Sequence, residues 1–340
     1  MRSGSCSGAA PTGGFGSNKI AGPIPEETIV KLATLVAPVV AVSAFSLSAV
    51  AAEDAGMPPE LAAKVAAIGR VIDPAKSAPL YVPLQEKEPY QGVRVARDVR
   101  YGPDERNLLD VFSPESAGGP RPVLMYVHGG GFVGGTKHAP GSPFYDNIHV
   151  WAVRHGMVGV NMTYRLAPAA KWPAGAEDVG RAVAWVRQDI AKYGGDPARI
   201  YIMGNSAGAV HVADYLAQVA EHKLPAIPVS GAILLSGIYD LARFDPAALK
   251  VYYGDNVQGY AERSPIHGLL ASRVPLIVST AELDPVSFER QAHELRDALC
   301  KSARGCQTFL VLAKHNHLTQ VQSINTADTT LTRHVLQFVK

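Results

Sequence analysis

The chain has 340 residues, 47% of them hydrophobic, which is enough to bury a large core without metal or disulfide support. Lysine and arginine number 32 and aspartate and glutamate 30, with no basic run along the chain. This even balance argues against a nucleic-acid partner, which requires a concentrated positive surface. No polar linker divides the middle of the chain, so we expect one large domain after a short N-terminal extension.

Residues 1–52 have the composition of an export leader. Residues 1–23 are rich in glycine, serine, proline and alanine, and no residue from Leu32 to Ala52 is charged. This apolar stretch ends in small residues (Ser48–Ala52), as does a signal peptide with an A-x-A-like cleavage site. A membrane anchor is the alternative, but the stretch is barely long enough and no positive residues follow it. We therefore expect an exported protein, periplasmic or secreted, without a stable membrane anchor after cleavage.

The charges ahead of this stretch do not suit a signal peptide, whose first residues are normally positive. Glu26 and Glu27 precede Lys31. A translation start at Val30, read as methionine from an alternative start codon, would give a short leader that begins with Lys31. The sequence leaves the true start open between Met1 and Val30.

Residues 53–90 form a segment ahead of the main domain. Between residues 58 and 71, apolar residues such as Leu61 and Val65 recur at helical spacing. The pattern predicts one amphipathic helix, and we expect it to form a small cap on the domain that follows.

The main domain, residues 91–340, alternates short apolar segments with amphipathic ones. Strands are predicted at 93–99, 108–112, 123–127, 158–164, 200–203, 232–235, 276–279 and 308–312, and helices at 175–193, 207–220, 288–301 and 331–339. This alternation predicts an α/β fold with a mostly parallel sheet covered by helices on both faces. Residues 239–272 look irregular and contain several tyrosines, Tyr239, Tyr252 and Tyr253 among them, which indicates an insertion over the edge of the sheet.

Two cysteines remain once the leader is set aside. Cys6 lies within the leader, which leaves Cys300 and Cys306. An even pair in an oxidising compartment predicts a local disulfide, with two free thiols as the alternative.

The motif G-x-S-x-G occurs at residues 204–208, between an apolar strand and a helix-forming run. A tight strand–turn–helix reversal needs glycines beside the serine, and it exposes the serine oxygen at the top of the sheet. The neighbouring helix N-terminus favours developing negative charge. We therefore expect Ser206 to be a nucleophile, with an ordinary turn serine as the alternative.

Three successive glycines follow the strand at 123–127, in the run His128–Phe132. Glycines let backbone N–H groups face a cleft without obstruction, as an oxyanion hole requires. We expect the N–H groups of Gly130, Gly131 and Ala207 to hold the oxyanion.

The same glycines satisfy G-x-G-x-x-G (residues 129–134), a pattern typical of dinucleotide sites. Such a site needs a helix that opens at the glycines and an acidic residue about twenty positions on. Residues 136–143 contain two prolines and cannot open a helix, and the region around Arg154 has no acidic residue. We therefore expect no cofactor.

An acid for a catalytic triad is expected after a later strand, because the chain order in such folds is serine, acid, histidine. Asp284 follows the strand at 276–279 and is the favoured candidate. Asp240 and Glu282 are the alternatives, and each of the three could instead be a solvated loop carboxylate.

The base is expected after the last strand, where His315-Asn316-His317 occurs. We favour His317 over His315 because Leu318 follows it as the chain turns inward. A His-x-His pair also suits a metal ion, but no third ligand lies at a recognisable spacing, so we expect no metal.

Five motifs occur in order within residues 100–320: His128–Phe132, Tyr164–Pro168 with Trp172–Ala174 and Asp178, Gly195–Pro197, Gly204–Ala209 and Asp284–Pro285. Together they resemble the hormone-sensitive-lipase family of bacterial esterases. The resemblance implies an α/β-hydrolase fold, a cap over the active site and cofactor-free cleavage of small carboxylic esters. It also implies a triad of Ser206, Asp284 and His317, with Gly130, Gly131 and Ala207 as oxyanion donors.

The chain departs from this family at three places. Asn205 stands where aspartate is usual, Ala209 where glycine is usual, and residues 315–318 lack the usual His-Gly-Phe. These features resemble the formamidase- and feruloyl-esterase-like relatives, so subfamily and substrate stay open.

We therefore expect a serine hydrolase that cleaves short-chain carboxylic esters through an acyl-enzyme. The short cap and the tyrosines of the insertion (Tyr239, Tyr252 and Tyr253) suggest a walled pocket of modest size. The alternatives are an arylformamidase or amidase, which uses the same machinery on a C–N bond, and a non-catalytic ligand-binding member of the fold. A small-molecule partner is expected, and the oligomeric state is left open between a monomer and a homodimer.

Overall fold

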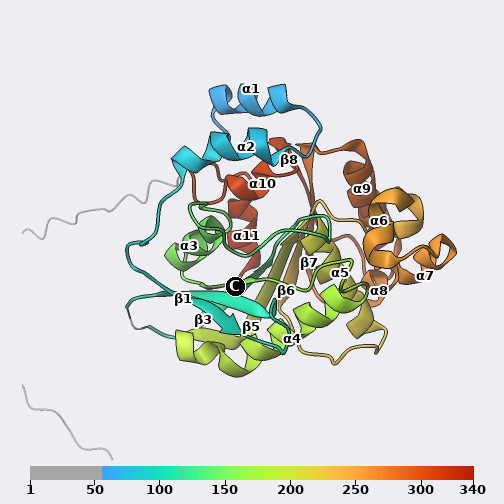
Figure 1. Ribbon diagram of the computed structural model, residues 1–340, viewed down its shortest axis with the longest axis horizontal. Coiled ribbons are helices and arrows are strands. Elements are labelled where there is room, and N and C mark those ends of the chain that lie inside the picture. The colour runs from blue at the N-terminus through green and yellow to red at the C-terminus, as the bar shows by residue number, and fades with distance from the viewer. Residues whose placement is uncertain (1–55, 117) are drawn as a thin grey trace, which may run out of the picture. The chain divides into compact units, whose positions relative to one another are not determined.

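The computed structural model describes residues 56–116 and 118–340, and its centre is an eight-stranded sheet (Figure 1). The strands are β1 (Val93–Arg100), β2 (Leu108–Pro114), β3 (Arg121–Val127), β4 (Val158–Met162), β5 (Gly195–Asn205), β6 (Gly231–Leu235), β7 (Leu276–Leu283) and β8 (Thr308–Asn316). Their spatial order is β1-β2-β4-β3-β5-β6-β7-β8. β2 pairs antiparallel with β1 and β4, and all other pairs are parallel.

Eleven α-helices lie within the described residues. They are α1 (Pro59–Ile68), α2 (Pro74–Tyr81), α3 (Asp146–Arg154), α4 (Ala174–Asp189), α5 (Ala207–Ala220), α6 (Pro246–Tyr253), α7 (Tyr260–Arg263), α8 (Ile266–Ala271), α9 (Val286–Lys301), α10 (Thr319–Gln322) and α11 (Thr332–Phe338). All eight predicted strands and the four predicted helices are present, with ends displaced by a few residues.

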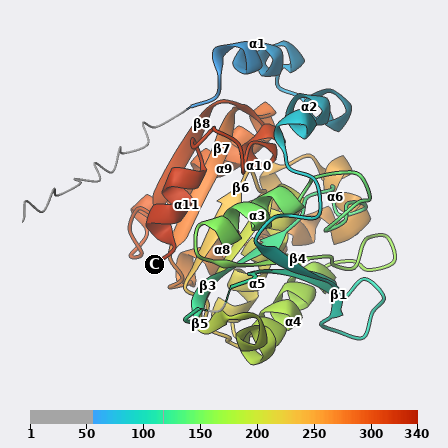
Figure 2. The ribbon, with the colours of Figure 1, turned by 90° about the vertical axis from the view of Figure 1, so that its left-hand side faces the viewer.

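The central strands are apolar on both faces because each face is covered by helices (Figure 2). Along β3, Val123 and Met125 join a core with α4, α5, α8 and α9, whereas Leu124 and Tyr126 join a second core with α3, α10 and α11. Alternate residues of a strand point to opposite faces, so a doubly covered strand reads as an unbroken apolar run. The predicted α/β fold with a mostly parallel, doubly covered sheet is confirmed.

The segment ahead of the sheet contains two helices, so the prediction of one helix over residues 58–71 was wrong. Gly69 has a φ of +78° and ends α1. Asp73 then starts α2, because its side chain accepts a hydrogen bond from the N–H of Lys76 (3.0 Å) and Pro74 suits the first helical position. The apolar pattern continues to Val71, but that side chain is 49% exposed in the turn between the helices.

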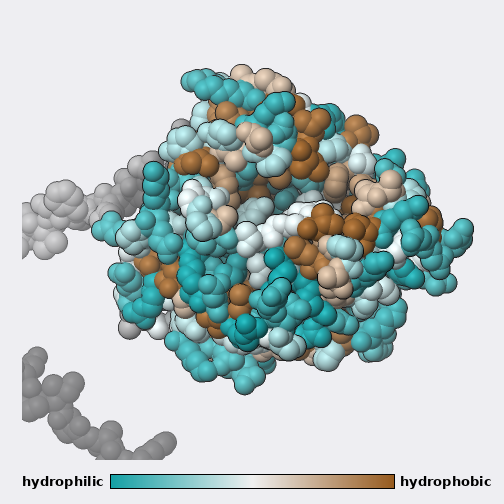
Figure 3. All heavy atoms as spheres, viewed as in Figure 1, coloured by the Kyte–Doolittle hydropathy of each residue, from teal (hydrophilic) through white to brown (hydrophobic). Residues whose placement is uncertain are grey.

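Residues 239–272 are not irregular, since they form the short helices α6, α7 and α8 between the interior strands β6 and β7. They share a core with Phe132, Ala207 and Val210, which follow β3 and β5. The insertion therefore covers the carboxyl ends of the strands rather than an outer strand. Figure 3 shows hydrophobic residues gathered on this face between the α1–α2 helices and the α6 region.

Tyr239, Tyr252 and Tyr253 of the insertion are buried and pack against the domain. The walled pocket of modest size stays a prediction. Tyr252 stacks on Phe132 with ring centroids 4.8 Å apart. Tyr253 donates a hydrogen bond to Asp214 (2.9 Å), and the N–H of Gly237 donates to the Tyr239 hydroxyl. These stacking contacts and hydrogen bonds attach the insertion to the rest of the domain.

The predicted disulfide between Cys300 and Cys306 is confirmed. It closes the turn between α9 and β8. No helix among residues 56–340 is long and apolar enough to cross a membrane. The expected leader and its cleavage site lie outside the described residues.

Candidate active site

Ser206 occupies the sharp turn between β5 and α5. Its φ of 56° and ψ of −124° belong to a backbone conformation that residues with side chains rarely adopt. A Cβ on Gly204 would lie 2.5 Å from the carbonyl carbon of Gly208, and one on Gly208 would lie 2.0 Å from the carbonyl oxygen of Val127. The turn therefore requires both glycines of the motif, and it exposes the serine at the carboxyl edge of the sheet.

The loop after β3 lies against this serine. A Cβ on Gly129 would lie 3.3 Å from the Cβ of Ser206. Gly130 and Gly131 have φ values of 129° and 60°, and neither N–H has an acceptor among the described residues. Ala207 is the first residue of α5, so its N–H has no acceptor within the helix. Of the three predicted oxyanion donors, Gly130 and Gly131 thus belong to the loop that lies against Ser206, and Ala207 directly follows Ser206.

His128, the first residue of this loop, is a buried side chain that carries no charge. It stacks on Tyr164 with centroids 4.4 Å apart, and its Nδ1 lies 2.6 Å from the carbonyl oxygen of Gly129. The Tyr164 hydroxyl donates to the carbonyl oxygen of His128 (2.9 Å). Burial lowers the pKa of His128 to about 4, so it carries no charge at neutral pH.

Asp284 and His317 form a buried hydrogen-bonded pair, with Nδ1 of the histidine 2.8 Å from Oδ1 of the aspartate. The second carboxylate oxygen accepts hydrogen bonds from Ser236 Oγ (2.6 Å), Thr280 Oγ1 (2.8 Å) and the N–H of Ala281 (2.7 Å). Burial alone would raise the pKa of Asp284, but the hydrogen bond and charge of His317 and these donors hold it below its usual value. The acid is therefore ionised.

The other ring nitrogen of His317, Nε2, is buried and has no hydrogen-bond partner among the described residues. Phe288 packs against the ring with centroids 4.5 Å apart. The side-chain amide of Asn205, directly before Ser206, donates to the carbonyl oxygen of His317 (3.4 Å). The structure thus brings the turn of Ser206 together with Asp284 and His317, as the sequence predicted, at one edge of the sheet.

The alternative acid and base residues make other contacts. His315 is buried, with Nδ1 3.2 Å from Thr319 Oγ1 and Nε2 3.1 Å from a carboxylate oxygen of Asp328. Glu282 accepts from the N–H of Lys314. The backbone of Asp240 bonds to Gln291 on α9. Among the described residues, no hydrogen bond or ion pair joins the side chains of these three to Asp284 or His317.

The two histidines of the His-x-His pair face different carboxylates and do not share a metal site. Among the described residues, one other group has ligand spacing: Glu88, His138 and Asp146. The guanidinium of Arg97 already pairs with Glu88 (3.0 Å) and Asp146 (2.5 Å). This group is therefore an ion-pair cluster with a cation of its own.

Several partners of the acid could not be found from the sequence. Ser236 and Thr280 hold the carboxylate, and Gln320 contacts Ser236 (2.8 Å). Arg70, between α1 and α2, donates through Nε to the carbonyl oxygen of Asp284 (2.7 Å). No local motif marks these residues, because they meet only in the folded chain.

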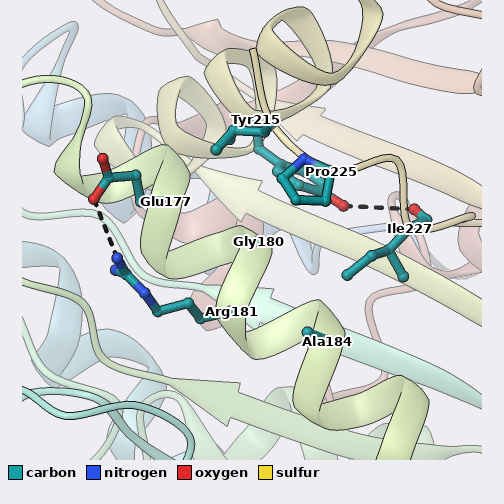
Figure 4. A pocket seen from close by; sticks show the side chains of 8 residues that line it. Glu177, Gly180, Arg181, Ala184, Tyr215, Pro225 and Ile227 are labelled. Carbon is teal, nitrogen blue, oxygen red and sulfur yellow. Dashed lines mark hydrogen bonds and ion pairs between the residues drawn. The ribbon is translucent and has the colours of Figure 1, made fainter. Parts of the chain in front are cut away.

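A cavity of about 340 Å³ lies away from this site (Figure 4). It is bounded by Gly180 and Arg181 of α4, Tyr215 of α5, and Pro225 and Ile227 of the loop that follows. Its walls are mostly apolar, and the ion pair between Arg181 and Glu177 joins two lining residues of α4. Ser206, Asp284 and His317 are not among its lining residues.

Comparison with known proteins identifies the family. The BD-FAE family model matches residues 109–299. This chain belongs to the BD-FAE family. Esterase LipQ of Mycobacterium tuberculosis (strain ATCC 25618 / H37Rv) is 32% identical over 65% of this chain and 56% of LipQ. Kynurenine formamidase of Danio rerio is 28% identical over 71% of this chain and 81% of the formamidase.

Solved structures agree with the observed fold. A thermostable esterase from Pseudomonas putida ECU1011 superposes with a TM-score of 0.61, at 20% identity, over 84% of this chain and 96% of that esterase. At this identity the likeness establishes the α/β-hydrolase fold alone. The chain spans a little over half the length of LipQ, so the activity is inferred from the site. The resemblance to hormone-sensitive-lipase-like esterases is confirmed at the level of family and fold.

Proposed function

We propose that this protein is a serine hydrolase that cleaves short-chain carboxylic esters through an acyl-enzyme. The observation that carries the proposal is the buried Asp284–His317 pair, whose Nε2 has no partner among the described residues. The backbone of this histidine is bonded to Asn205, directly before Ser206 in its strained turn. A carboxylate, a histidine and a serine in this relation perform nucleophilic acyl transfer in unrelated folds. The esterase LipQ is a relative in agreement with this activity.

The reaction follows from the roles of the three side chains. Oγ of Ser206 attacks the ester carbonyl carbon while its proton passes to Nε2 of His317. The C–O bond to the alcohol then breaks, and His317 returns that proton to the leaving oxygen. Water next attacks the acyl-enzyme with the same histidine as base, which releases the acid and restores Ser206. Asp284 remains ionised throughout and stabilises the imidazolium.

The oxyanion is assigned to the N–H groups of Gly130, Gly131 and Ala207. Negative charge develops on the carbonyl oxygen only as the tetrahedral intermediate forms, so preorganised donors lower the barrier more than they strengthen substrate binding. The N–H groups of Gly130 and Gly131, which have no acceptor among the described residues, suit this role, as does the N-terminus of α5.

The preference for short acyl chains is supported by the aromatic rings beside the base. Phe288 contacts His317, and Phe244 packs against Phe288 with centroids 5.3 Å apart. These rings narrow the space next to Nε2. We expect p-nitrophenyl esters from acetyl to hexanoyl to be cleaved well and palmitoyl esters poorly; activation by an oil–water interface would contradict this.

An organophosphate and one variant test the proposal. The reagent should add once per chain, and peptide mass analysis should place the adduct on Ser206. Ser206→Ala should keep the fold, lose labelling and lose kcat by about 10⁶-fold, because triad residues act as a unit. Substantial esterase activity in this variant would refute the proposal.

An arylformamidase is the second candidate, supported by the similarity to kynurenine formamidase over 81% of that protein. The same side chains can attack a formamide, with His317 protonating the leaving nitrogen. Measuring kcat/KM on phenyl acetate and on N-formyl anilides separates the two functions. A higher value on the formamide would favour the second.

We also propose that the protein acts outside the cytoplasm. The uncharged stretch 32–52 and its small terminal residues support a cleaved signal peptide. The disulfide between Cys300 and Cys306 supports an oxidising compartment.

A further inference from the structure

The side chain of Gln320 is fully buried three residues after His317. Its Nε2 donates to the Oγ of Ser236 (2.8 Å) and to the carbonyl oxygen of His317 (2.9 Å). Ser236 in turn donates to Oδ2 of Asp284 (2.6 Å). One amide group therefore contacts the loop that carries the base and the serine that holds the acid.

The direction of these hydrogen bonds is fixed by the charge on the acid. An ionised carboxylate can only accept, so the Ser236 hydroxyl must donate its proton to Asp284. The serine oxygen is then free to accept from one N–H of Gln320, and the second N–H reaches the His317 carbonyl. Hydrogen bonds in such a chain polarise and strengthen one another.

Ser236, directly after β6, donates to Oδ2 of Asp284 from outside the strand that carries the acid. Thr280 and Ala281 lie on β7 with the acid, whereas Ser236 follows β6. Its φ of +50° is unfavourable for a serine and persists only where the surroundings impose it. Through Gln320, it connects the Asp284 carboxylate to the backbone carbonyl of His317, in addition to the direct bond between the two side chains.

We propose that Gln320, acting through Ser236, is a positioning residue that aligns the acid with the base. This inference rests on the proposed hydrolase function. Gln320 touches neither substrate nor reacting atoms; it holds Oδ1 of Asp284 in line with Nδ1 of His317 as the ring becomes charged. Positioning of this kind acts on the transition state, so it changes kcat more than KM.

Gln320→Leu and Ser236→Ala test the network, alone and together. Each single variant should lose about 10- to 100-fold in kcat per titrated active site, with KM within about twofold. The double variant should lose at most about threefold more than the worse single variant, because both break one chain of hydrogen bonds. Ser236→Ala removes one oxygen atom, so it tests the idea even if Gln320→Leu folds poorly.

Gln322→Leu is the matched control. Gln322 is also a buried amide of α10, but its side chain has no hydrogen bond to Ser236, Asp284 or His317 among the described residues. This variant should keep kcat within about twofold of the wild type. The low-field proton signal of the His317–Asp284 hydrogen bond, recorded on a boronic-acid adduct, should shift in the Gln320 and Ser236 variants and stay in place in the control.

Three results would overturn the inference: unchanged kcat in both single variants, an unmoved low-field signal, or losses that disappear after correction for active-site titre. The last result would mean that the network serves folding alone. Failure of the proposed function looks different, because Ser206→Ala would then retain activity or the wild type would not cleave esters.

Discussion

The carboxylate of Asp284 accepts four hydrogen bonds among the described residues, and the one from His317 joins it to the proposed base. The other three keep the carboxylate ionised and oriented. In the proposed mechanism His317 then donates from Nδ1, which leaves Nε2 to take the proton of Ser206. Asp284→Asn preserves the size but can reverse the tautomer of the ring. We expect kcat to fall by about 10³- to 10⁴-fold.

Asp240→Asn is the control for this substitution, since the Asp240 carboxylate has no hydrogen bond to His317 among the described residues. We expect less than about threefold change in kcat. Steady-state kinetics on p-nitrophenyl acetate would measure both variants. Equal damage from the two substitutions would contradict the assignment of the acid.

Substitution of the two histidines near the end of β8 should have different effects: one should lower kcat and the other the free energy of unfolding. His317→Ala removes the base, so we expect a loss of kcat comparable to that of Ser206→Ala. His315→Ala removes the imidazole from the buried Asp328 carboxylate, which keeps the N–H of Thr330 as a donor. We expect this loss to cost about 1–3 kcal/mol of unfolding free energy. The activity of the remaining folded protein should be nearly unchanged. Urea unfolding with active-site titration distinguishes this result from its reverse.

Asp214 predicts a pH-dependent stability unrelated to catalysis. Burial raises its pKa to about 8, against the usual value near 4 for an unfolded chain. The native state therefore binds a proton that the unfolded state releases between these values, so the residue's contribution to stability falls as pH rises from about 4 to 8. Asn cannot ionise and keeps an oxygen to accept from Tyr253.

Asp214→Asn should therefore gain stability relative to the wild type as pH rises from 5 to 9. The difference in unfolding free energy should grow by roughly 1 kcal/mol per pH unit within the window. Urea unfolding at pH 5, 7 and 9 would measure it. A difference that is constant with pH would show that Asp214 does not titrate in this range.

At the scale of elements, the sequence predicted what periodicity and motif chemistry encode. The strands and the Ser206 turn were found because a covered strand is apolar throughout and the turn leaves no room for a Cβ at Gly204 or Gly208. α3 was missed because burial along it does not follow polarity: polar residues such as Asp146 and Asn147 are buried there beside apolar ones.

Those buried polar residues are satisfied by distant parts of the chain. Asp146 pairs with Arg97 on β1, and Asn147 donates to the carbonyl oxygens of Val321 and Ile324. Ser236 and Gln320 were not predicted as site residues because they too bond to residues far away in the sequence. Their partners lie 48 and 84 positions away, so no spacing in the sequence could indicate them.

The α1–α2 segment should be part of the catalytic unit rather than a detachable cap. The Gln85 side chain, just after α2, donates to the carbonyl oxygens of Gln322, the last residue of α10, and of Ile324 beyond it. Gln85→Leu removes this donor from the Gln322 carbonyl, whereas the Ile324 carbonyl keeps its hydrogen bond from Asn147. We expect a loss of about 1–3 kcal/mol in unfolding free energy.

Glu60→Gln is the control, because the Glu60–Lys64 ion pair on α1 is exposed to solvent. Its loss should change stability by less than about 0.5 kcal/mol. Chemical denaturation of both variants is the measurement. Equal stability of Gln85→Leu and the wild type would show that the segment is only loosely attached.

At the scale of the whole molecule, the family match ends at residue 299, before β8 and the proposed base. The match covers the Gly204–Gly208 motif and Asp284 but not His317, so the proposed role of His317 rests on the geometry of the folded chain. The disulfide between Cys300 and Cys306 lies just beyond this limit, in the turn that leads into the strand of the base.

Export and the disulfide give one joint prediction. Cleavage near Ala52 removes Arg2, Lys19 and Lys31 with Glu26 and Glu27, so the formal net charge falls from +2 to +1. N-terminal sequencing of protein collected outside the cytoplasm should begin near Ala52 or Glu53. The intact mass should be lower by two hydrogens than that of the reduced mature chain.

Changing both Cys300 and Cys306 to serine should cost about 2 kcal/mol of unfolding free energy at most, because the closed loop is short. Esterase activity at 25 °C should remain, since the bond touches no reacting group. Protein made in the cytoplasm with reduced thiols is the natural comparison and should match the double variant in stability. Free thiols in exported material would refute the disulfide, whereas loss of all activity in the double variant would show that the β8 strand depends on it to place His317.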